Sequence, residues 1–220
     1  MTEQTKRFWI REPFCGLSHG MGAVLSVVAL VVLLVLAHGK LWQTISFAVF
    51  GISLIVLYTA SMLYHSLWVK PKQILALMRF DHVAIFLLIA GTYAPVCLVS
   101  LRGPWGWSLF GVEYGLAVIG IVCSLVWKGF PDWARISIYV VMGWLIMIAI
   151  VPAIHVLGPA GLAWLFGGGA AYSIGTIVFA TDKPHLWPGK FSAHDLWHIF
   201  VLAGSTCHFV LMAVVIAPML

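Results

Sequence analysis

Long apolar stretches alternate with short polar breaks along the whole chain, and this pattern limits the possible folds more than any other feature. Of the 220 residues, 62% are hydrophobic and only 9% are charged. A soluble domain carries about 25% charged residues, and a helix needs about 20 apolar residues to cross a bilayer. One soluble core does not hide this much apolar surface. We therefore expect an integral membrane protein.

Seven stretches are long and apolar enough to form spanning helices. They cover residues 19–38, 42–66, 80–101, 106–127, 133–155, 159–180 and 193–217. The polar breaks between them are short, so no separate soluble domain is expected. The sequence therefore predicts an all-α fold, a seven-transmembrane helix bundle, in which residues 19–217 form a single membrane domain after a cytoplasmic N-terminal segment, 1–18.

Lysine and arginine residues are distributed unequally between the two sides of this expected bundle. The side with fewer has Lys40 and Arg102. The other side has Lys6, Arg7, Arg11, Lys70, Lys72, Arg79, Lys128, Arg135, Lys183 and Lys190. Basic residues next to spans favour the cytoplasmic side, so we expect a cytoplasmic N-terminus and an outside C-terminus. The net charge of +5 is explained by topology and lipid contact, and no nucleic-acid binding is expected.

Several polar side chains lie inside the expected spans, where ionisable groups are costly and each one is a candidate functional group. Ser61 and His65 lie near the end of the second span, Asp81 begins the third, and His194 and His198 begin the seventh. The topology brings all of them to one level, near the cytoplasmic face. Each pair is spaced by four residues, which places both members on one helix face.

This convergence predicts a metal site. His65, His194 and His198 supply three imidazoles, which leave one position open for water, as in catalytic zinc sites. Asp81 would hold or deprotonate that water, or orient a histidine. Ser61 would form a hydrogen bond in the same network. The alternative is that the histidines only form hydrogen bonds between helices.

Two other features are expected to be structural. Ser192 and Asp195 form an S-x-x-D capping box, so Asp195 is expected to fix the start of the last helix. The cysteines occur singly, without a CxxC pair, so neither a disulfide framework nor a thiolate zinc site is expected. They are Cys15, Cys97, Cys123 and Cys207.

The remaining intramembrane polar residues have weaker predicted roles. His19 lies at the right depth to line the site, whereas His82 follows Asp81 directly and is expected on another helix face. His208 lies about 15 Å deeper than His198, at about 1.5 Å per residue, and is expected to bond a neighbouring helix. Glu113 stands alone in the outer part of the fourth span.

Four motifs occur in order along the chain: SHGMG (18–22), SMLYHS (61–66), FDHVAIFLLIAGTYAP (80–95) and HDLWHIFVLAGSTCHF (194–209). Together they resemble the hemolysin III family of bacterial inner-membrane proteins. That family belongs with the progestin and adiponectin receptor group and, more distantly, with the alkaline ceramidases. The resemblance covers essentially the whole chain, through all seven expected spans.

The resemblance implies a zinc ion (Zn2+) held by His65, His194 and His198, with Asp81 and Ser61 in the same site. Its receptor and ceramidase relatives imply hydrolysis of a lipid amide, so a membrane lipid would be the partner and substrate. The family name implies cytolysis, which is a phenotype. The implied location is the bacterial inner (plasma) membrane, crossed several times.

Three functions therefore stay open at this point. The first is a zinc-dependent membrane hydrolase of a lipid-like amide or ester. The second is a non-catalytic membrane sensor or regulator with structural zinc, which a closed four-coordinate site would favour. The third is a pore-forming or transport protein, which requires a polar path across the whole bilayer. Glycine patterns such as GLSHG permit helix association but set no oligomeric state.

Overall fold

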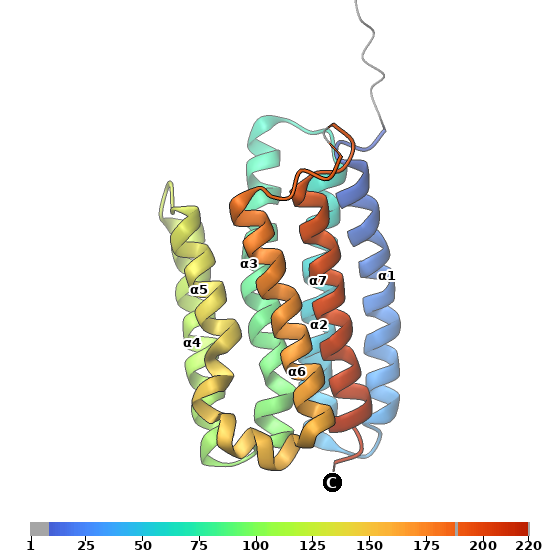
Figure 1. The fold of residues 1–220 in the computed structure, drawn as a ribbon, viewed down its shortest axis with the longest axis vertical. Coiled ribbons are helices and arrows are strands. Elements are labelled where there is room, and N and C mark those ends of the chain that lie inside the picture. The colour runs from blue at the N-terminus through green and yellow to red at the C-terminus, as the bar shows by residue number, and fades with distance from the viewer. Residues whose placement is uncertain (1–8, 188, 220) are drawn as a thin grey trace, which may run out of the picture.

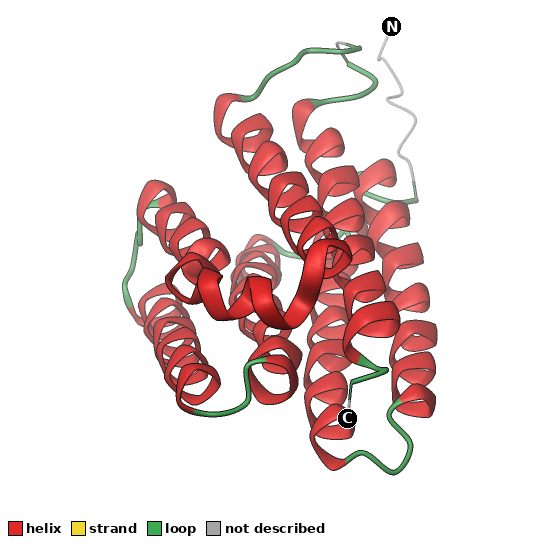
Figure 2. Ribbon diagram, turned by 60° about the horizontal axis from the view of Figure 1, so that its bottom comes forward, coloured by secondary structure: helices red, strands yellow, loops and turns green. Residues whose placement is uncertain are grey.

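A computed structural model of the chain describes residues 9–187 and 189–219. Over these residues the fold is all-α, as predicted: long helices lie side by side in a bundle, joined by short loops (Figures 1 and 2). The β contact found in this part of the chain is one isolated bridge, Trp187 to Phe191. The helices are α1 (Pro13–Leu36), α2 (Leu41–Ser66), α3 (Pro71–Pro95), η1 (Val96–Ser100), α4 (Pro104–Val126), α5 (Asp132–Trp144), η2 (Leu145–Ala149), α6 (Ile150–Thr181), α7 (Ala193–Val210) and η3 (Leu211–Ile216).

Two helices begin earlier than the apolar stretches predicted. α1 begins at Pro13 rather than at residue 19, and α3 begins at Pro71 rather than at residue 80. Proline suits the first turn of a helix, because its fixed φ fits and its missing N–H has no helical partner there. The early start of α1 places Cys15 on a helix. Residues 1–8 of the predicted N-terminal segment lie outside the described residues.

Residues 132–181 form one continuous helical stretch of 50 residues, made of α5, η2 and α6. A straight helix of this length would span about 75 Å, far more than the hydrocarbon core of about 30 Å. The chain instead folds back: α5 runs down and most of α6 runs up in Figure 1. Gly158 breaks the helical geometry with φ 62° and ψ −178°, a conformation that favours glycine. A polar break was expected at this position, but the expected span 133–155 is not one α-helix, because α5 ends at Trp144 and the 3₁₀ helix η2 follows it.

Apolar side chains cover the outside of the bundle as well as its interior. Val24, Val35 and Val126 are 66%, 69% and 75% exposed, while Phe47 and Phe50 are fully buried. Such an apolar surface is unusual in water and is expected of helices that face lipid. Within residues 9–187 and 189–219, six helices are long and apolar enough to cross a membrane when 132–181 is counted once. The fold is therefore that of a multi-pass membrane protein.

A shared hydroxyl joins α2, α6 and α7. The Tyr58 hydroxyl donates to Ser205 Oγ at 2.7 Å, and the Tyr172 hydroxyl lies 2.8 Å from the same atom. Each tyrosine ring packs on a glycine: an added Cβ at Gly22 or Gly204 would lie 2.7 Å from Tyr58 or Tyr172, respectively. Glycine therefore permits the close approach of these helices, and the junction fixes α7 relative to α2.

Candidate metal centre

α2 ends and α7 begins at the same end of the bundle, which we call the histidine end. His65 lies in the last turn of α2, and His194 and His198 lie in the first turns of α7. The His194 and His198 Nε2 atoms are 3.2 Å apart. The ring centroid of His65 lies 5.2 Å from that of His194 and 4.8 Å from that of His198. The structure thus brings together the three histidines that the sequence predicted as ligands.

The start of α7 is fixed by the predicted capping box. Ser192 Oγ accepts a hydrogen bond from the Asp195 main-chain N–H at 3.1 Å. Asp195 Oδ2 in turn accepts one from the Ser192 main-chain N–H at 2.8 Å. These reciprocal bonds satisfy two helix-end donors. They hold the first turn of α7, and with it His194, in a defined position.

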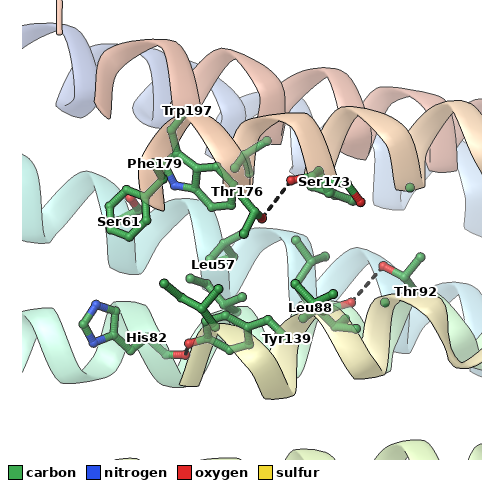
Figure 3. A pocket seen from close by; sticks show the side chains of 18 of the residues that line it. Leu57, Ser61, His82, Leu88, Thr92, Tyr139, Ser173, Thr176, Phe179 and Trp197 are labelled. Carbon is green, nitrogen blue, oxygen red and sulfur yellow. Dashed lines mark hydrogen bonds between the residues drawn. The ribbon is translucent and has the colours of Figure 1, made fainter. Parts of the chain in front are cut away.

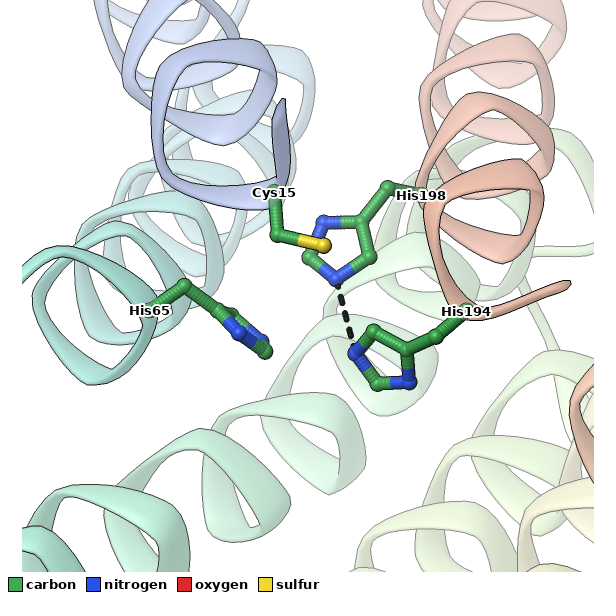
Figure 4. A group of neighbouring side chains, drawn as sticks. All are labelled: Cys15, His65, His194 and His198. Atoms are coloured by element: carbon green, nitrogen blue, oxygen red, sulfur yellow. Dashed lines mark hydrogen bonds between the residues drawn. The ribbon is translucent and has the colours of Figure 1, made fainter. Parts of the chain in front are cut away.

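Cys15 lies beside the three histidines, although the single cysteines gave no reason to expect a thiolate zinc site. One ligand atom from each of Cys15, His65, His194 and His198 lies within 4.8 Å of the others (Figure 4). The four residues form a group able to hold a metal ion. Sulfur and imidazole nitrogen are the donors that zinc commonly takes. The sequence did not predict this neighbour because Cys15 meets the histidines through the packing of α1, and no local spacing shows that contact.

Glu12 is not one of the four donors but contacts His65, and the sequence analysis did not predict this contact. Its Oε2 atom lies 2.5 Å from His65 Nδ1. This hydrogen bond holds the pKa of Glu12 below its ordinary value. A carboxylate on one ring nitrogen orients a histidine and leaves the other nitrogen free for a metal. The one signal in the sequence was an acid three residues before Cys15.

Asp81 and Ser61 form a second polar group beside the histidines. A side-chain hydrogen bond joins the Ser61 hydroxyl to the Asp81 carboxylate. Both residues line the cavity that the three histidines also line. Asp81 does not belong to the four-residue donor group itself. It therefore lies beside the donor group, on the wall of the same cavity.

The cavity has a volume of about 400 Å³ and extends from the histidine end into the bundle between α2, α3, α5, α6 and α7. Apolar and aromatic side chains make up most of its wall, including Leu57, Leu88, Tyr139, Phe179 and Trp197 (Figure 3). Small-molecule sites typically combine such an apolar wall with a few polar groups. The space suits an amphiphile with its polar group at the histidines.

Three other histidines line the same cavity. The His19 ring centroid is 3.9 Å from that of His198, so His19 lies at the predicted depth. His208 Nε2 lies 3.4 Å from the Leu165 carbonyl oxygen, which is the predicted contact with a neighbouring helix. His82 was expected on a different face from the acid before it, yet it also borders the cavity.

Glu113 on α4 is fully buried, and neither of its carboxyl oxygens has a hydrogen-bond partner. It does not line the cavity. The structure gives it no part in the candidate metal centre.

Fold and cluster together define a class: a multi-pass helical membrane protein with a buried cysteine–histidine group at one end of an apolar cavity. A family profile described as Haemolysin-III related matches residues 8–209. The chain therefore belongs to this family, as its motifs predicted.

Individual relatives agree with this assignment. The chain is 38% identical over 223 residues to Hemolysin-3 of Bacillus cereus, across 99% of both proteins. It is 40% identical over 206 residues to the Hemolysin-3 homolog of Bacillus subtilis (strain 168), across 92% of this chain and 93% of that one. The human Monocyte to macrophage differentiation factor is more distant, at 24% identity over 175 residues, with 76% of this chain and 69% of that one covered.

Proposed function

We propose that this protein crosses a bacterial inner membrane seven times, binds one zinc ion at the histidine end, and hydrolyses a lipid-like amide or ester. The reversal near Gly158 supports two crossings within residues 132–181. The excess of basic residues supports a cytoplasmic histidine end and an outside C-terminus. The two Bacillus relatives support a bacterial membrane.

One observation carries the proposal: the histidines and the Ser61–Asp81 pair line one largely apolar cavity. The histidines supply nitrogen ligands at its polar end. The apolar wall offers space for an acyl chain. An amphiphile bound there has its head group beside Asp81, which is where a hydrolase needs the scissile bond.

The histidines and Asp81 would have different roles in the proposed hydrolysis. His65, His194 and His198 would hold the zinc, which when bound supplies a Lewis acid and lowers the pKa of a coordinated water to about 7. The Asp81 carboxylate would take a proton from the attacking water, oriented by its hydrogen bond with Ser61. That proton would pass to the leaving nitrogen or oxygen as the acyl bond breaks.

A second candidate function is a non-catalytic sensor or regulator with structural zinc. Cys15 favours it, because a fourth protein donor allows a closed four-coordinate site.

The third function expected from the sequence, a pore or transporter, would be tested by measuring ion flux in proteoliposomes.

The test pairs zinc content with turnover, using protein purified in detergent without chelators. For the wild type and for Asp81→Asn we expect about one zinc per chain. We expect Asp81→Asn to lower the hydrolysis of lipid amides or esters by ~10²- to 10⁴-fold, because a general base is lost. The double variant His38→Ala/His155→Ala, at two exposed histidines, is the matched control and should keep both properties.

Three results would lead to different conclusions. Zinc with no turnover on any lipid amide or ester would favour the sensor. Turnover that Asp81→Asn leaves intact would remove the role given to Asp81. Absence of bound metal would overturn the zinc site itself.

A further inference from the structure

Cys15 lies at the donor cluster but away from the cavity. Its side chain is 2% exposed, and its Sγ lies 3.1 Å from Asp195 Oδ1, to which the thiol donates a hydrogen bond. The three histidines line the cavity, as does Asp81, but Cys15 does not. A metal held by the histidines would therefore have the thiol as one neighbour and the cavity as another.

The position of Cys15 is fixed by contacts that need no metal. The Glu12 main-chain N–H donates to the His65 carbonyl at 2.9 Å, which ties the start of α1 to the end of α2. Gly16 packs so closely on α2 that an added Cβ would lie 2.4 Å from Ser66 Oγ. The capping box holds Asp195, the partner of the thiol, on α7. The thiol is thus preorganised beside the histidines.

Unpaired nitrogens in the cluster also point to a ligand. His198 is 1% exposed and its Nδ1 atom has no hydrogen-bond partner. His19, packed against it, is 3% exposed and neither of its ring nitrogens has a partner. Buried polar atoms normally have partners, so these unpaired nitrogens favour a bound species at the histidine end.

We propose that the Cys15 thiolate is a displaceable fourth ligand of the metal. This rests on the proposed zinc site and adds regulation to it. With Cys15 bound, three imidazoles and one thiolate close the site, and the metal is stored without an open position. Release of the thiolate, which takes up a proton again, would leave the metal with an open position for a water that enters from the cavity, whose wall includes Asp81. Binding of the metal displaces the thiol proton, which is released to solvent.

Cobalt spectroscopy tests the proposal directly. The purified full-length protein is stripped of metal and loaded with Co2+, which replaces zinc and is coloured. We expect a thiolate-to-cobalt charge-transfer band in the near ultraviolet for the wild type. Cys15→Ser should lose this band while it keeps the visible bands of histidine-bound cobalt. The matched control is Cys123→Ser, on α4 outside the donor group, and it should keep both.

A second measurement needs no variant, in case Cys15→Ser does not fold. X-ray absorption of the zinc-loaded wild type should show one sulfur at ~2.3 Å beside nitrogens at ~2.0 Å. Nitrogen and oxygen scatterers alone, or a charge-transfer band that survives in Cys15→Ser, would overturn the role of Cys15 and leave the histidine site standing. Failure of the wild type to bind either metal would overturn the site and the thiol ligand together.

Discussion

Two regions of this protein bury polar side chains, and they do so differently. At the histidine end, Glu12 and Cys15 meet histidines from two other helices, and each side chain contacts another. On α4, Glu113 is fully buried but neither of its oxygens has a partner. A gathered set of donors can be stabilised by a ligand that satisfies all of them. A lone buried acid is tolerated only without its charge. Burial alone therefore does not identify a site.

The largest expected effect is the loss of bound zinc when histidine ligands are removed at the histidine end. His194→Ala/His198→Ala removes two of the three imidazoles, so we expect complete loss of the bound zinc, measured by mass spectrometry of the purified protein. The matching double variant His38→Ala/His155→Ala should retain it. Retention of zinc by the first variant would place the metal elsewhere and break the contrast between the two regions.

A smaller effect is expected from the residue that orients a ligand. Glu12→Gln keeps the size of the side chain but removes the carboxylate on His65 Nδ1. Loss of such a partner typically lowers metal affinity by about 10- to 100-fold, which chelator competition would measure. The melting temperature of the metal-free protein should change little.

The control for Glu12 is Asp182→Asn, an exposed acid at the end of α6. Its zinc affinity should match the wild type. Equal affinity in Glu12→Gln would show that the carboxylate only fastens the N-terminal segment to α2.

The smallest effect on stability and on zinc binding is expected from a substitution of Glu113. Glu113→Gln removes the ability to ionise and keeps the shape, so we expect the free energy of unfolding to change by less than about 1 kcal/mol. Zinc content and turnover should be unchanged. A marked loss of either would show that Glu113 has a partner, and the two regions would then be alike.

The helical fold and much of the site could be predicted because their signals are local. Apolar length predicted the helices, and the glycine and proline at 158–159 predicted the reversal near Gly158. The spacing of the histidine pair on α7, together with topology, predicted which polar residues meet. The early helix starts at Pro13 and Pro71 were missed because apolar counting ignores proline-led first turns that contain polar residues.

Glu12 and Cys15 could not be predicted in the same way. Their positions depend on main-chain hydrogen bonds between the N-terminal segment and the end of α2, such as Glu12 N–H to His65 O. Such a contact leaves no periodic pattern in the sequence. The capping box at Ser192 is the opposite case, since both of its partners lie within one turn.

The donors of the cluster come from the two ends of the chain. Cys15 and His65 belong to the first two helices, and His194 and His198 belong to the last. A membrane protein that is inserted from its N-terminus therefore has no complete donor set until α7 is in place. If the proposed zinc binds there, its loading is the final step of biogenesis, and a chain truncated before α7 would reach the membrane without the complete set of donors.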